Sequence, residues 1–254
     1  MKKIGKKNRK IGIISQARMA GTRLPGKLML PIKWKPLLWY FKERLKESGI
    51  PLYIATSTYG SNDIIAAFAK EEGITVFRGD EDNVLKRYYD CAKENELDVI
   101  IRITADCPLS DGVMIKDAVE KYLAFDDDNI HYSNCVEHTY PHGHNFEIFS
   151  FKLLEDAYHT ATTDFHREHV TPCIIQNISG KVILRHYLRE EDASMYRITV
   201  DTYEDLVLIQ KLIEEYGADT KTTEEIIAIF KAHPELMEIN KPKTEHIWGD
   251  GRKQ

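Results

Sequence analysis

One short segment near the start of the chain, QARMAGTRLPGK at residues 16–27, combines two glycines with three cationic side chains. It directly follows the apolar run at residues 11–14. Backbone N–H groups of such a loop, together with guanidinium and ammonium groups, can converge on the oxygens of a polyphosphate. The segment therefore predicts a binding site for a nucleoside triphosphate. The residues expected there are the cations Arg18, Arg23 and Lys27 and the backbone at Ala17, Gly21 and Gly26.

The alternative for this loop is a set of ordinary surface charges on a turn shaped by Pro25 and Gly26. The density of the cations and their position after the first apolar run favour the phosphate site. The chain contains neither G-x-x-x-x-G-K-[ST] nor G-x-G-x-x-G, so neither a Walker loop nor a dinucleotide fingerprint is present.

Two aspartates follow later apolar runs. Asp106 lies in RITADCPL, just before Pro108, and Asp201 ends RITVD. A Mg²⁺ ion bound to a triphosphate takes one or two protein carboxylates and several waters. Each aspartate also has a simpler explanation, since Asp-x-Pro is a common turn and Asp201 can cap the helix that follows. Taken together, the two strand-end aspartates predict a Mg²⁺ pair.

The segment RGDEDN at residues 78–83 follows the third apolar run. It is typical of a turn that enters a helix, with Asp82 or Asn83 as the cap. A side-chain amide or a backbone group here can also read the edge of a pyrimidine. The candidate nucleotide-binding residues in it are Arg78, Asp80 and Asn83.

Histidines are concentrated in YPHGHNFE, residues 140–147, and in DFHREH, residues 164–169. His166 and His169 are three residues apart and lack the spacing of a zincin helix, so hydrogen bonding or substrate contact is favoured over zinc. The candidate substrate-binding residues of the two segments are His142, His144, Asn145, Glu147, Arg167 and His169.

The first half of the chain alternates apolar runs with segments whose apolar residues recur every three or four positions. The runs are residues 11–15, 52–56, 75–77 and 99–104, and the helical segments are 36–47, 62–72, 83–94 and 113–123. This alternation predicts an α/β fold with a doubly wound, mainly parallel sheet. Ligands of such sheets bind at the carboxyl ends of the strands, where the basic loop and Asp106 would meet.

The regular alternation ends after residue 126. The strands expected beyond it are 130–133, 146–151, 182–188 and 197–200, and the expected helices are 153–160, 166–176, 203–216 and 223–232. We expect a single nucleotidyltransferase domain over residues 11–240, between a basic tail (1–10) and a polar tail (241–254). An insertion at about residues 130–190 would meet the substrate or a second subunit.

Composition narrows the class of protein. With 35 basic and 40 acidic residues the net charge is −5, which argues against a nucleic-acid partner. No run approaches the ~20 apolar residues of a membrane span, so no membrane partner is expected. The four cysteines form no C-x-x-C pair and read as reduced thiols of a cytoplasmic protein, and no G-x-S-x-G nucleophile is present.

These motifs, together with FRGDEDNVLKRY, HREHVTP and RITVDTYEDLVLI, stand in the order found in the spore coat polysaccharide biosynthesis protein F family. That family is similar to the cytidylyltransferases that activate sialic acid and 3-deoxy-manno-octulosonate. The resemblance covers residues 11–216 and implies a nucleotide-diphospho-sugar transferase fold. It also implies transfer of CMP from CTP to an acidic sugar or related acceptor, with release of pyrophosphate, for surface polysaccharide or glycan biosynthesis.

The resemblance implies a role for each motif that matches. It places the triphosphate on Arg18, Arg23 and Lys27 and Mg²⁺ on Asp106 and Asp201, and it implies a homodimer. Two positions depart from the family pattern, because His142 and Asn145 stand where aspartates are expected, while Glu147 is retained. Trp34 also replaces a small loop residue. These departures concern the acceptor and leave the nucleotide half of the pattern intact.

Two alternatives remain at this point. A glycosyltransferase of related fold would consume a nucleotide sugar and would show Asp-x-Asp at a strand end, a spacing that residues 126–128 offer. A non-catalytic nucleotide-binding domain would bind CTP without turnover. Retention of the three loop cations and both aspartates argues against this second alternative.

Overall fold

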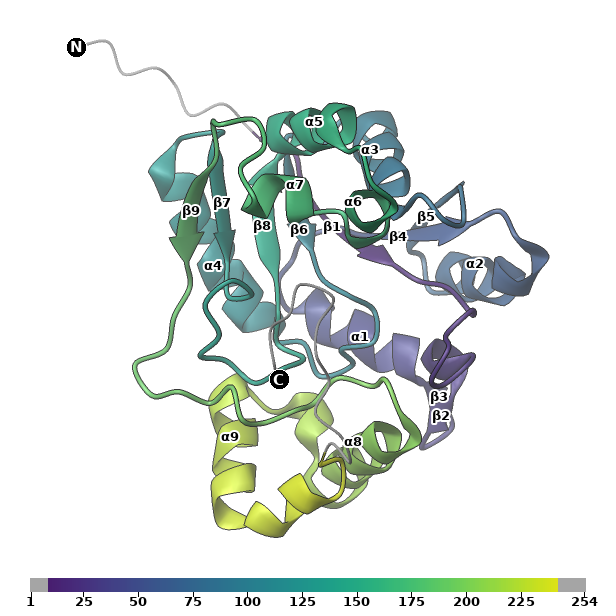
Figure 1. Cartoon of the computed structure of the whole chain (residues 1–254). Helices are drawn as coiled ribbons and strands as arrows, with labels where there is room; N and C mark the ends of the chain where they lie inside the picture. Colours follow the sequence, from purple (N-terminus) through teal and green to yellow (C-terminus); the bar gives the residue numbers. More distant parts are fainter. Residues whose placement is uncertain (1–8, 242–254) are drawn as a thin grey trace.

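The computed structural model describes residues 9–241. The predicted tails, apart from residues 9, 10 and 241, lie outside the described residues. A seven-stranded sheet with helices on both faces forms the centre of the described chain (Figure 1). Its strands run in the order β5 (Thr75–Gly79), β4 (Leu52–Ser57), β1 (Ile11–Gln16), β6 (Val99–Arg102), β8 (Glu147–Ser150), β7 (Ile130–Ser133) and β9 (Ile183–His186). This architecture confirms the predicted α/β fold of the nucleotide-diphospho-sugar transferase type.

Four strands from the first half of the chain form the parallel part of the sheet. β1 pairs in parallel with β4 on one side and with β6 on the other, and β4 pairs in parallel with β5. Successive residues of β1 face opposite sides of the sheet, so Ile13 and Ile14 belong to different hydrophobic clusters. Because both faces are covered, these strands read as continuous apolar runs.

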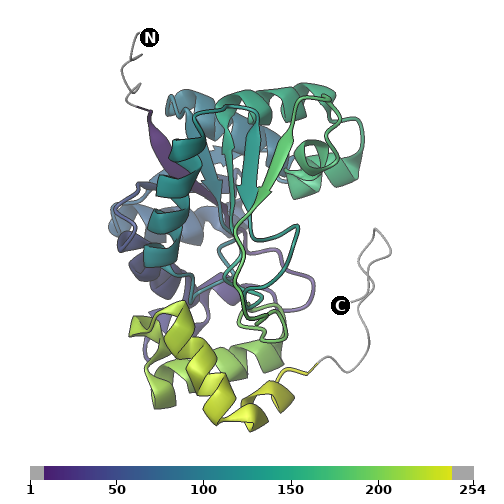
Figure 2. The ribbon, with the colours of Figure 1, turned by 90° about the vertical axis from the view of Figure 1, so that its left-hand side faces the viewer.

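Helices cover both faces of the sheet (Figure 2). One face packs against α1 (Leu37–Lys46), α2 (Asp63–Glu71) and α4 (Gly112–Phe125). The other packs against α3 (Val84–Glu94), α5 (Phe151–Thr160) and α7 (Pro172–Ile175), and α6 (Asp164–His169) lies against α3. A small hairpin of β2 (Pro31–Ile32) and β3 (Lys35–Pro36) precedes α1, with the 97% exposed Trp34 at its turn.

A third cluster of buried hydrophobic residues includes the inner faces of α8 (Tyr203–Tyr216) and α9 (Thr223–Ala232). Both helices begin with a capping box, in which Thr202 pairs with Asp205 and Thr222 pairs with Glu225. In Figure 1 the two helices lie at one end of the molecule, below the sheet. No helix within residues 9–241 is long and apolar enough to cross a membrane.

The second half of the chain departs from the prediction in two places. The expected strand at residues 197–200 is absent, and only one parallel bridge forms there, between His142 and Arg197. The expected helix at residues 166–176 is divided into α6 and α7, with Val170 at the break. β8 is antiparallel to both of its neighbours, so the sheet is mixed at this edge although parallel pairs predominate.

Candidate active site

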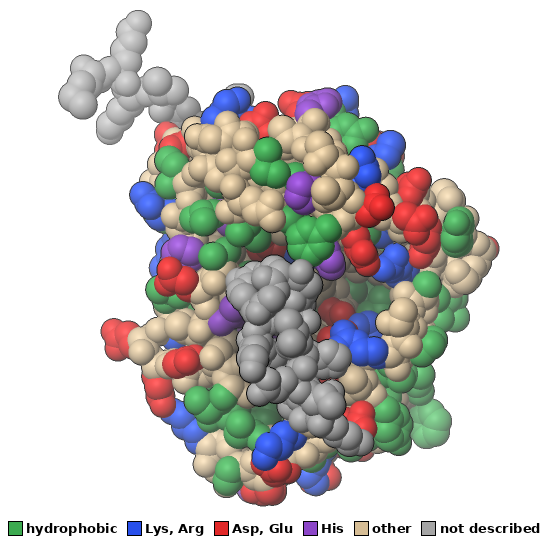
Figure 3. All heavy atoms as spheres, viewed as in Figure 1, with side chains coloured by type: hydrophobic (Ala, Val, Ile, Leu, Met, Phe, Trp, Pro, Cys, Tyr) green, Lys and Arg blue, Asp and Glu red, His purple; other side chains and the backbone are tan. Residues whose placement is uncertain are grey.

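A cavity of about 380 Å³ lies at the carboxyl ends of β1 and β6. Gln16 ends β1, and Thr104 to Asp106 follow β6, so both strands deliver residues to its wall. Figure 3 shows basic and acidic side chains next to one another at a hollow on one face of the molecule. Seven of the residues predicted from the sequence line this cavity: Arg18, Gly21, Arg23, Lys27, Asp106, His169 and Asp201.

The basic loop is held by its own backbone and by one buried side chain. The amides of Gly21 and Gly26 both donate to the carbonyl of Met19, and the amide of Met19 donates to Asn62 Oδ1 at 2.7 Å. Asn62 is fully buried and donates in turn to Ser57 Oγ and Glu81 Oε2. Asn62 therefore acts as an anchor for the loop, a role that its position before α2 does not reveal.

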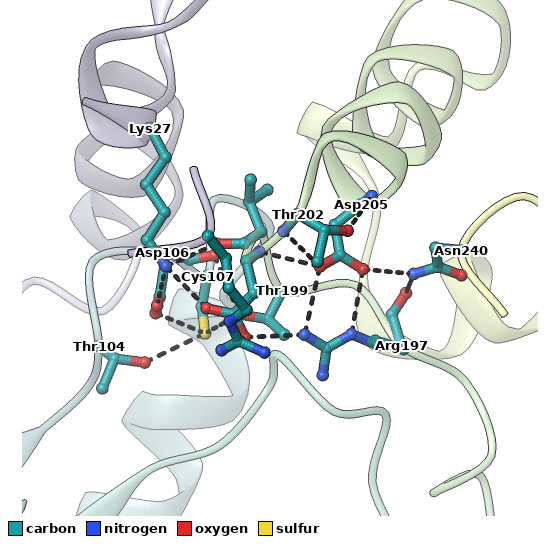
Figure 4. Close-up of polar contacts among 12 residues, drawn as sticks. Lys27, Thr104, Asp106, Cys107, Arg197, Thr199, Thr202, Asp205 and Asn240 are labelled. Atoms are coloured by element: carbon teal, nitrogen blue, oxygen red, sulfur yellow. Dashed lines mark hydrogen bonds and ion pairs between the residues drawn. The ribbon is translucent and has the colours of Figure 1, made fainter. Parts of the chain in front are cut away.

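The two predicted metal aspartates, 95 positions apart in the sequence, are brought together by a backbone contact. The amide of Val200 donates to the carbonyl of Asp106 at 2.9 Å, and Thr199 Oγ1 donates to the same carbonyl. Lys27 Nζ then reaches Asp106 Oδ2 at 2.7 Å, Asp201 Oδ1 at 2.8 Å and the carbonyl of Val200 at 2.8 Å (Figure 4). Burial opposes the charge on Lys27, but the two carboxylates outweigh it and raise its pKa.

Asp201 is held by cations on two further sides. Arg23 lies 3.1 Å and Arg197 2.8 Å from its Oδ2. Arg197 is fixed by Asp205, which also accepts from Asn240 (Figure 4). Burial raises the pKa of Asp201, but Lys27 and Arg23 outweigh it and lower it to about 2. The cap of α8 is Thr202, so the alternative role of Asp201 as a helix cap is excluded.

The donor atoms around Lys27 Nζ fit a hard divalent cation. Two carboxylate oxygens and one carbonyl oxygen converge on a single point, and oxygen ligands are those that Mg²⁺ prefers. Residues 9–241 contain no group of three or more His, Cys, Asp or Glu side chains that could hold a metal by themselves. The arrangement therefore suits Mg²⁺ that also receives ligands from a bound triphosphate, as is usual for this ion.

The predicted nucleotide-binding residues at the end of β5 and directly after it form hydrogen bonds with other parts of the protein. Arg78 donates to the carbonyls of Ser57 and Tyr59 and pairs with Asp63. Asp80 accepts from the amides of Asp82 and Asn83, and Asn83 accepts from the amide of Lys86 as the cap of α3. None of the three predicted residues is among those that line the cavity within residues 9–241. These contacts fit the helix-entry alternative, and a nucleotide-binding role for the segment stays a prediction. Ala17, 1% exposed, and Gly26 also lie outside the lining.

Two predicted substrate residues are interior. His144 is 1% exposed, and its Nε2 lies 2.8 Å from the carbonyl of Leu109. Glu147 is 2% exposed and is bonded to Arg102, His131 and Thr171. Both side chains are buried and hydrogen-bonded within the fold, so their contact with the acceptor stays a prediction that these positions do not support.

Three of the other four predicted substrate residues also lie outside the lining of the cavity among the residues described. His142 joins two segments through its backbone, because its amide donates to Tyr196 and its carbonyl accepts from Ile198. Arg167 pairs with Asp164 on the surface of α6. Asn145 lies beside the buried strand β8, and His169 is the residue of this set that reaches the cavity.

The burial of His144 predicts a loss of stability in acid. Burial is the main cause that lowers its pKa from 6.5 to about 4. Between these values the unfolded chain binds a proton that the folded chain excludes, so this contribution to stability is complete above pH 6.5 and declines as the pH falls towards 4. From pH 7 to pH 5 we expect His144 to account for a loss of about 2 kcal/mol in the free energy of unfolding.

The variant His144→Gln, which keeps a donor for the Leu109 carbonyl, should flatten this pH dependence in urea unfolding measured at pH 7 and pH 5. The exposed His159, replaced in the same way, serves as the control. Equal pH dependence in the wild type and His144→Gln would exclude this role.

Sequence reasoning missed Arg87 on α3, which is 1% exposed and also lines the cavity. Its Nη1 donates to the carbonyls of Asp80 and Glu81. Its Nε and Nη2 have no hydrogen-bond partner among the described residues. Burial lowers the pKa of this guanidinium. Arg87 occurs in FRGDEDNVLKRY, but a cation in the first half of a helix gives no signal that it is buried beside a ligand cavity.

Comparison with known proteins agrees with this geometry. A family model described as "Cytidylyltransferase" matches residues 11–241. An uncharacterised protein of Methanocaldococcus jannaschii is 34% identical over 236 residues, which cover 91% of this chain and 93% of that protein. The spore coat polysaccharide biosynthesis protein SpsF of Bacillus subtilis is 31% identical over 232 residues, covering 87% and 94%. The solved structure of a cytidylyltransferase from Leptospira borgpetersenii matches with a TM-score of 0.86 and 32% identity, covering 94% of this chain and 100% of that one.

Proposed function

Because this chain belongs to the cytidylyltransferase family, we propose that it transfers CMP from CTP to an acidic sugar or related acceptor and releases pyrophosphate. The family makes the protein a CTP-dependent nucleotidyltransferase and confirms the resemblance inferred from the motifs. The acceptor class, a place in surface polysaccharide or glycan biosynthesis and the roles of individual residues belong to the proposal. So do a homodimer, which sedimentation velocity tests, and a cytoplasmic location.

The observation that carries the proposal is the convergence of cations and carboxylates at one end of the cavity. Lys27 lies within 2.8 Å of oxygens from Asp106 and Asp201, and Arg23 lies 3.1 Å from Asp201. A magnesium–triphosphate complex needs both kinds of group, since cations neutralise its phosphates and carboxylates ligate its metal. Arg18, at the other side of the same cavity, adds a third cation.

In the proposed reaction, an oxygen of the acceptor attacks the α-phosphorus of CTP in line with the departing group. A bond forms between this oxygen and the α-phosphorus, and the bond from the α-phosphorus to its bridging oxygen breaks, so that pyrophosphate leaves with the electron pair. Arg18, Arg23 and Lys27 would hold the phosphates and stabilise the negative charge that increases on the leaving group. An acceptor oxygen that is already ionised needs no general base.

Asp106 and Asp201 would hold Mg²⁺ in place of the Lys27 ammonium group that they contact in this structure. When bound, Mg²⁺ supplies charge neutralisation and Lewis-acid polarisation of phosphate oxygens. The protein side chains contribute alignment, because the backbone contact between Val200 and Asp106 fixes the separation of the two carboxylates.

The structure gives no support to the glycosyltransferase alternative. Asp126 and Asp128 have the Asp-x-Asp spacing but follow α4, and both pair with Arg9. Asp80 and Asp82 have the same spacing after β5, where Asp80 accepts from the amide of Asp82. None of the four is among the described residues that line the cavity.

The proposal is tested by measuring pyrophosphate release with each of the four nucleoside triphosphates, Mg²⁺ and a panel of sugar acids, phosphates and phosphonates. We expect release that depends on both CTP and an acidic acceptor. Hydrolysis of a nucleotide sugar, or CTP binding without turnover across the panel, would support one of the two alternatives instead.

Removal of divalent metal gives a further prediction. EDTA should abolish acceptor-dependent pyrophosphate release, and excess Mg²⁺ should restore it, because Mg²⁺ held by Asp106 and Asp201 would neutralise and polarise the phosphate oxygens of CTP. The free energy of unfolding should stay within about 1 kcal/mol under the same treatment, since no cluster within residues 9–241 could hold a structural metal. Full activity in EDTA would contradict the metal assignment.

A further inference from the structure

The backbone at Val170, between α6 and α7, adopts an unusual turn. Val170 has φ 70° and ψ −57°, and the amide of Thr171 donates to the carbonyl of His169 at 2.9 Å. This i to i+2 hydrogen bond with positive φ defines a classic γ-turn, which is rare and strained. A buried β-branched residue in such a conformation costs on the order of 1–3 kcal/mol, so the surrounding structure must impose it.

The turn directly follows two residues that reach the cavity, Glu168 and His169. Glu168 also lies 3.7 Å from Arg18 of the basic loop. These two residues end α6, which has only six residues, of which one, His166, is buried. An isolated helix of this length is unstable in water. The placement of Glu168 and His169 therefore depends on what holds the C-terminal end of α6.

Thr171 ties this end to the sheet. Its Oγ1 donates to Glu147 Oε1 at 3.1 Å, and both residues are buried. Glu147 begins β8 opposite Arg102 of β6 and pairs with its guanidinium. Its other oxygen, Oε2, lies 2.9 Å from His131 Nε2 of β7. Three adjacent strands of the sheet therefore fix the carboxylate that Thr171 contacts.

The carboxylate of Glu147 is a strong acceptor at all ordinary pH values. Burial alone would raise the pKa of Glu147, but Arg102 and His131 outweigh burial and lower it to about 2. Hydrogen bonds to a charged group are stronger than those between neutral groups. The contact from Thr171 thus joins a strained turn to a carboxylate fixed within the sheet.

We propose that Glu147 and Thr171 are positioning residues: their hydrogen bond imposes the γ-turn at Val170 and thereby fixes Glu168 and His169 at the edge of the cavity. The presence of Glu147 in the family motif is then explained by its role in positioning α6 and not by contact with the acceptor. The inference rests on the proposed function only for its effect on the reaction, since the clamp itself is a property of the fold. The competing explanation is that Pro172, which begins α7, and the packing of Val170 hold the turn without the hydroxyl group.

The variants Thr171→Val and Thr171→Ser separate these explanations. Valine keeps the shape and the β-branch of threonine but removes the donor, whereas serine keeps the donor. The first measurement is amide hydrogen exchange over residues 164–171 in the full chain without ligand. We expect Thr171→Val to increase exchange there on the order of tenfold, as for loss of one hydrogen bond to a charged group, and to leave β1 and β6 unchanged.

The second measurement is kcat and KM for pyrophosphate release. Thr171→Val should lower kcat/KM on the order of tenfold, and Thr171→Ser should restore both exchange and kcat/KM to within about twofold of the wild type. Should Thr171→Val fail to fold, Thr171→Ala replaces it. Unchanged exchange in residues 164–171, or faster exchange with unchanged kcat/KM, overturns the inference. Absence of CTP turnover in the wild type overturns the proposed function, and the exchange comparison still decides whether the clamp exists.

Discussion

Replacing Lys27 with alanine is expected to lower kcat for pyrophosphate release by about 100- to 1,000-fold, the usual cost of losing one preorganised donor at developing charge. Lys27 is the cation in contact with both Asp106 and Asp201, and its pKa is raised by them despite its burial, so it stays charged. In the proposed reaction this charge faces the triphosphate. Lys27→Arg should recover little activity, because a planar guanidinium cannot reproduce the three contacts of the ammonium group.

The matched control is Lys46→Ala, since Lys46 is exposed at the end of α1 and is not among the residues that line the cavity. Steady-state kinetics of both variants, with thermal unfolding as a check of folding, decide the case. Activity of Lys27→Ala within threefold of the wild type would remove Lys27 from the proposed mechanism.

Replacing Glu147 with alanine is expected to lower the free energy of unfolding by about 3–5 kcal/mol, the usual cost of breaking a buried ion pair by removal of one partner. Arg102 would keep its charge in the interior without a counterion, and the fully buried His131 would lose its acceptor. The Glu147 carboxylate raises the pKa of Arg102 against the effect of burial, and this stabilisation of the charged guanidinium is lost in the variant.

Urea unfolding at pH 7 measures this loss. Glu191→Ala is the control, because Glu191 forms an exposed pair with Lys231 and its loss should change the free energy of unfolding far less. The double variant Arg102→Met with Glu147→Leu should be more stable than Glu147→Ala, since it removes the unpaired charge. A change below about 1 kcal/mol in Glu147→Ala would show that water or another group solvates Arg102.

The parallel half of the fold could be predicted from the sequence because its strands are buried on both faces. Ile13 and Ile14 each enter a core, so β1 reads as an unbroken apolar run. The second half of the fold was predicted less accurately. Ile198, Thr199 and Val200 are buried, but residues 197–200 form one bridge to His142 instead of a strand. The break at Val170 depends on a distant carboxylate, which no local pattern reveals.

The site could be predicted where it lies at strand ends. The basic loop follows β1, Asp106 follows β6, and parallel strands bring such segments to one edge. Local reasoning does not reveal where a polar side chain forms hydrogen bonds with remote parts of the fold. His144 bonds to Leu109, and Arg78 bonds to backbone carbonyls that precede it by about twenty residues. The amino-acid type and the sequence motif alone do not distinguish such residues from residues that bind a ligand.

The most direct test of the proposed reaction is ³¹P NMR of the products formed from CTP, Mg²⁺ and an acidic acceptor identified from the panel. Transfer at the α-phosphorus predicts equal amounts of pyrophosphate and of a new CMP conjugate, both lost in Lys27→Ala. Formation of CDP and inorganic phosphate, or of free CMP without a conjugate, would contradict nucleotidyl transfer to an acceptor in this cavity.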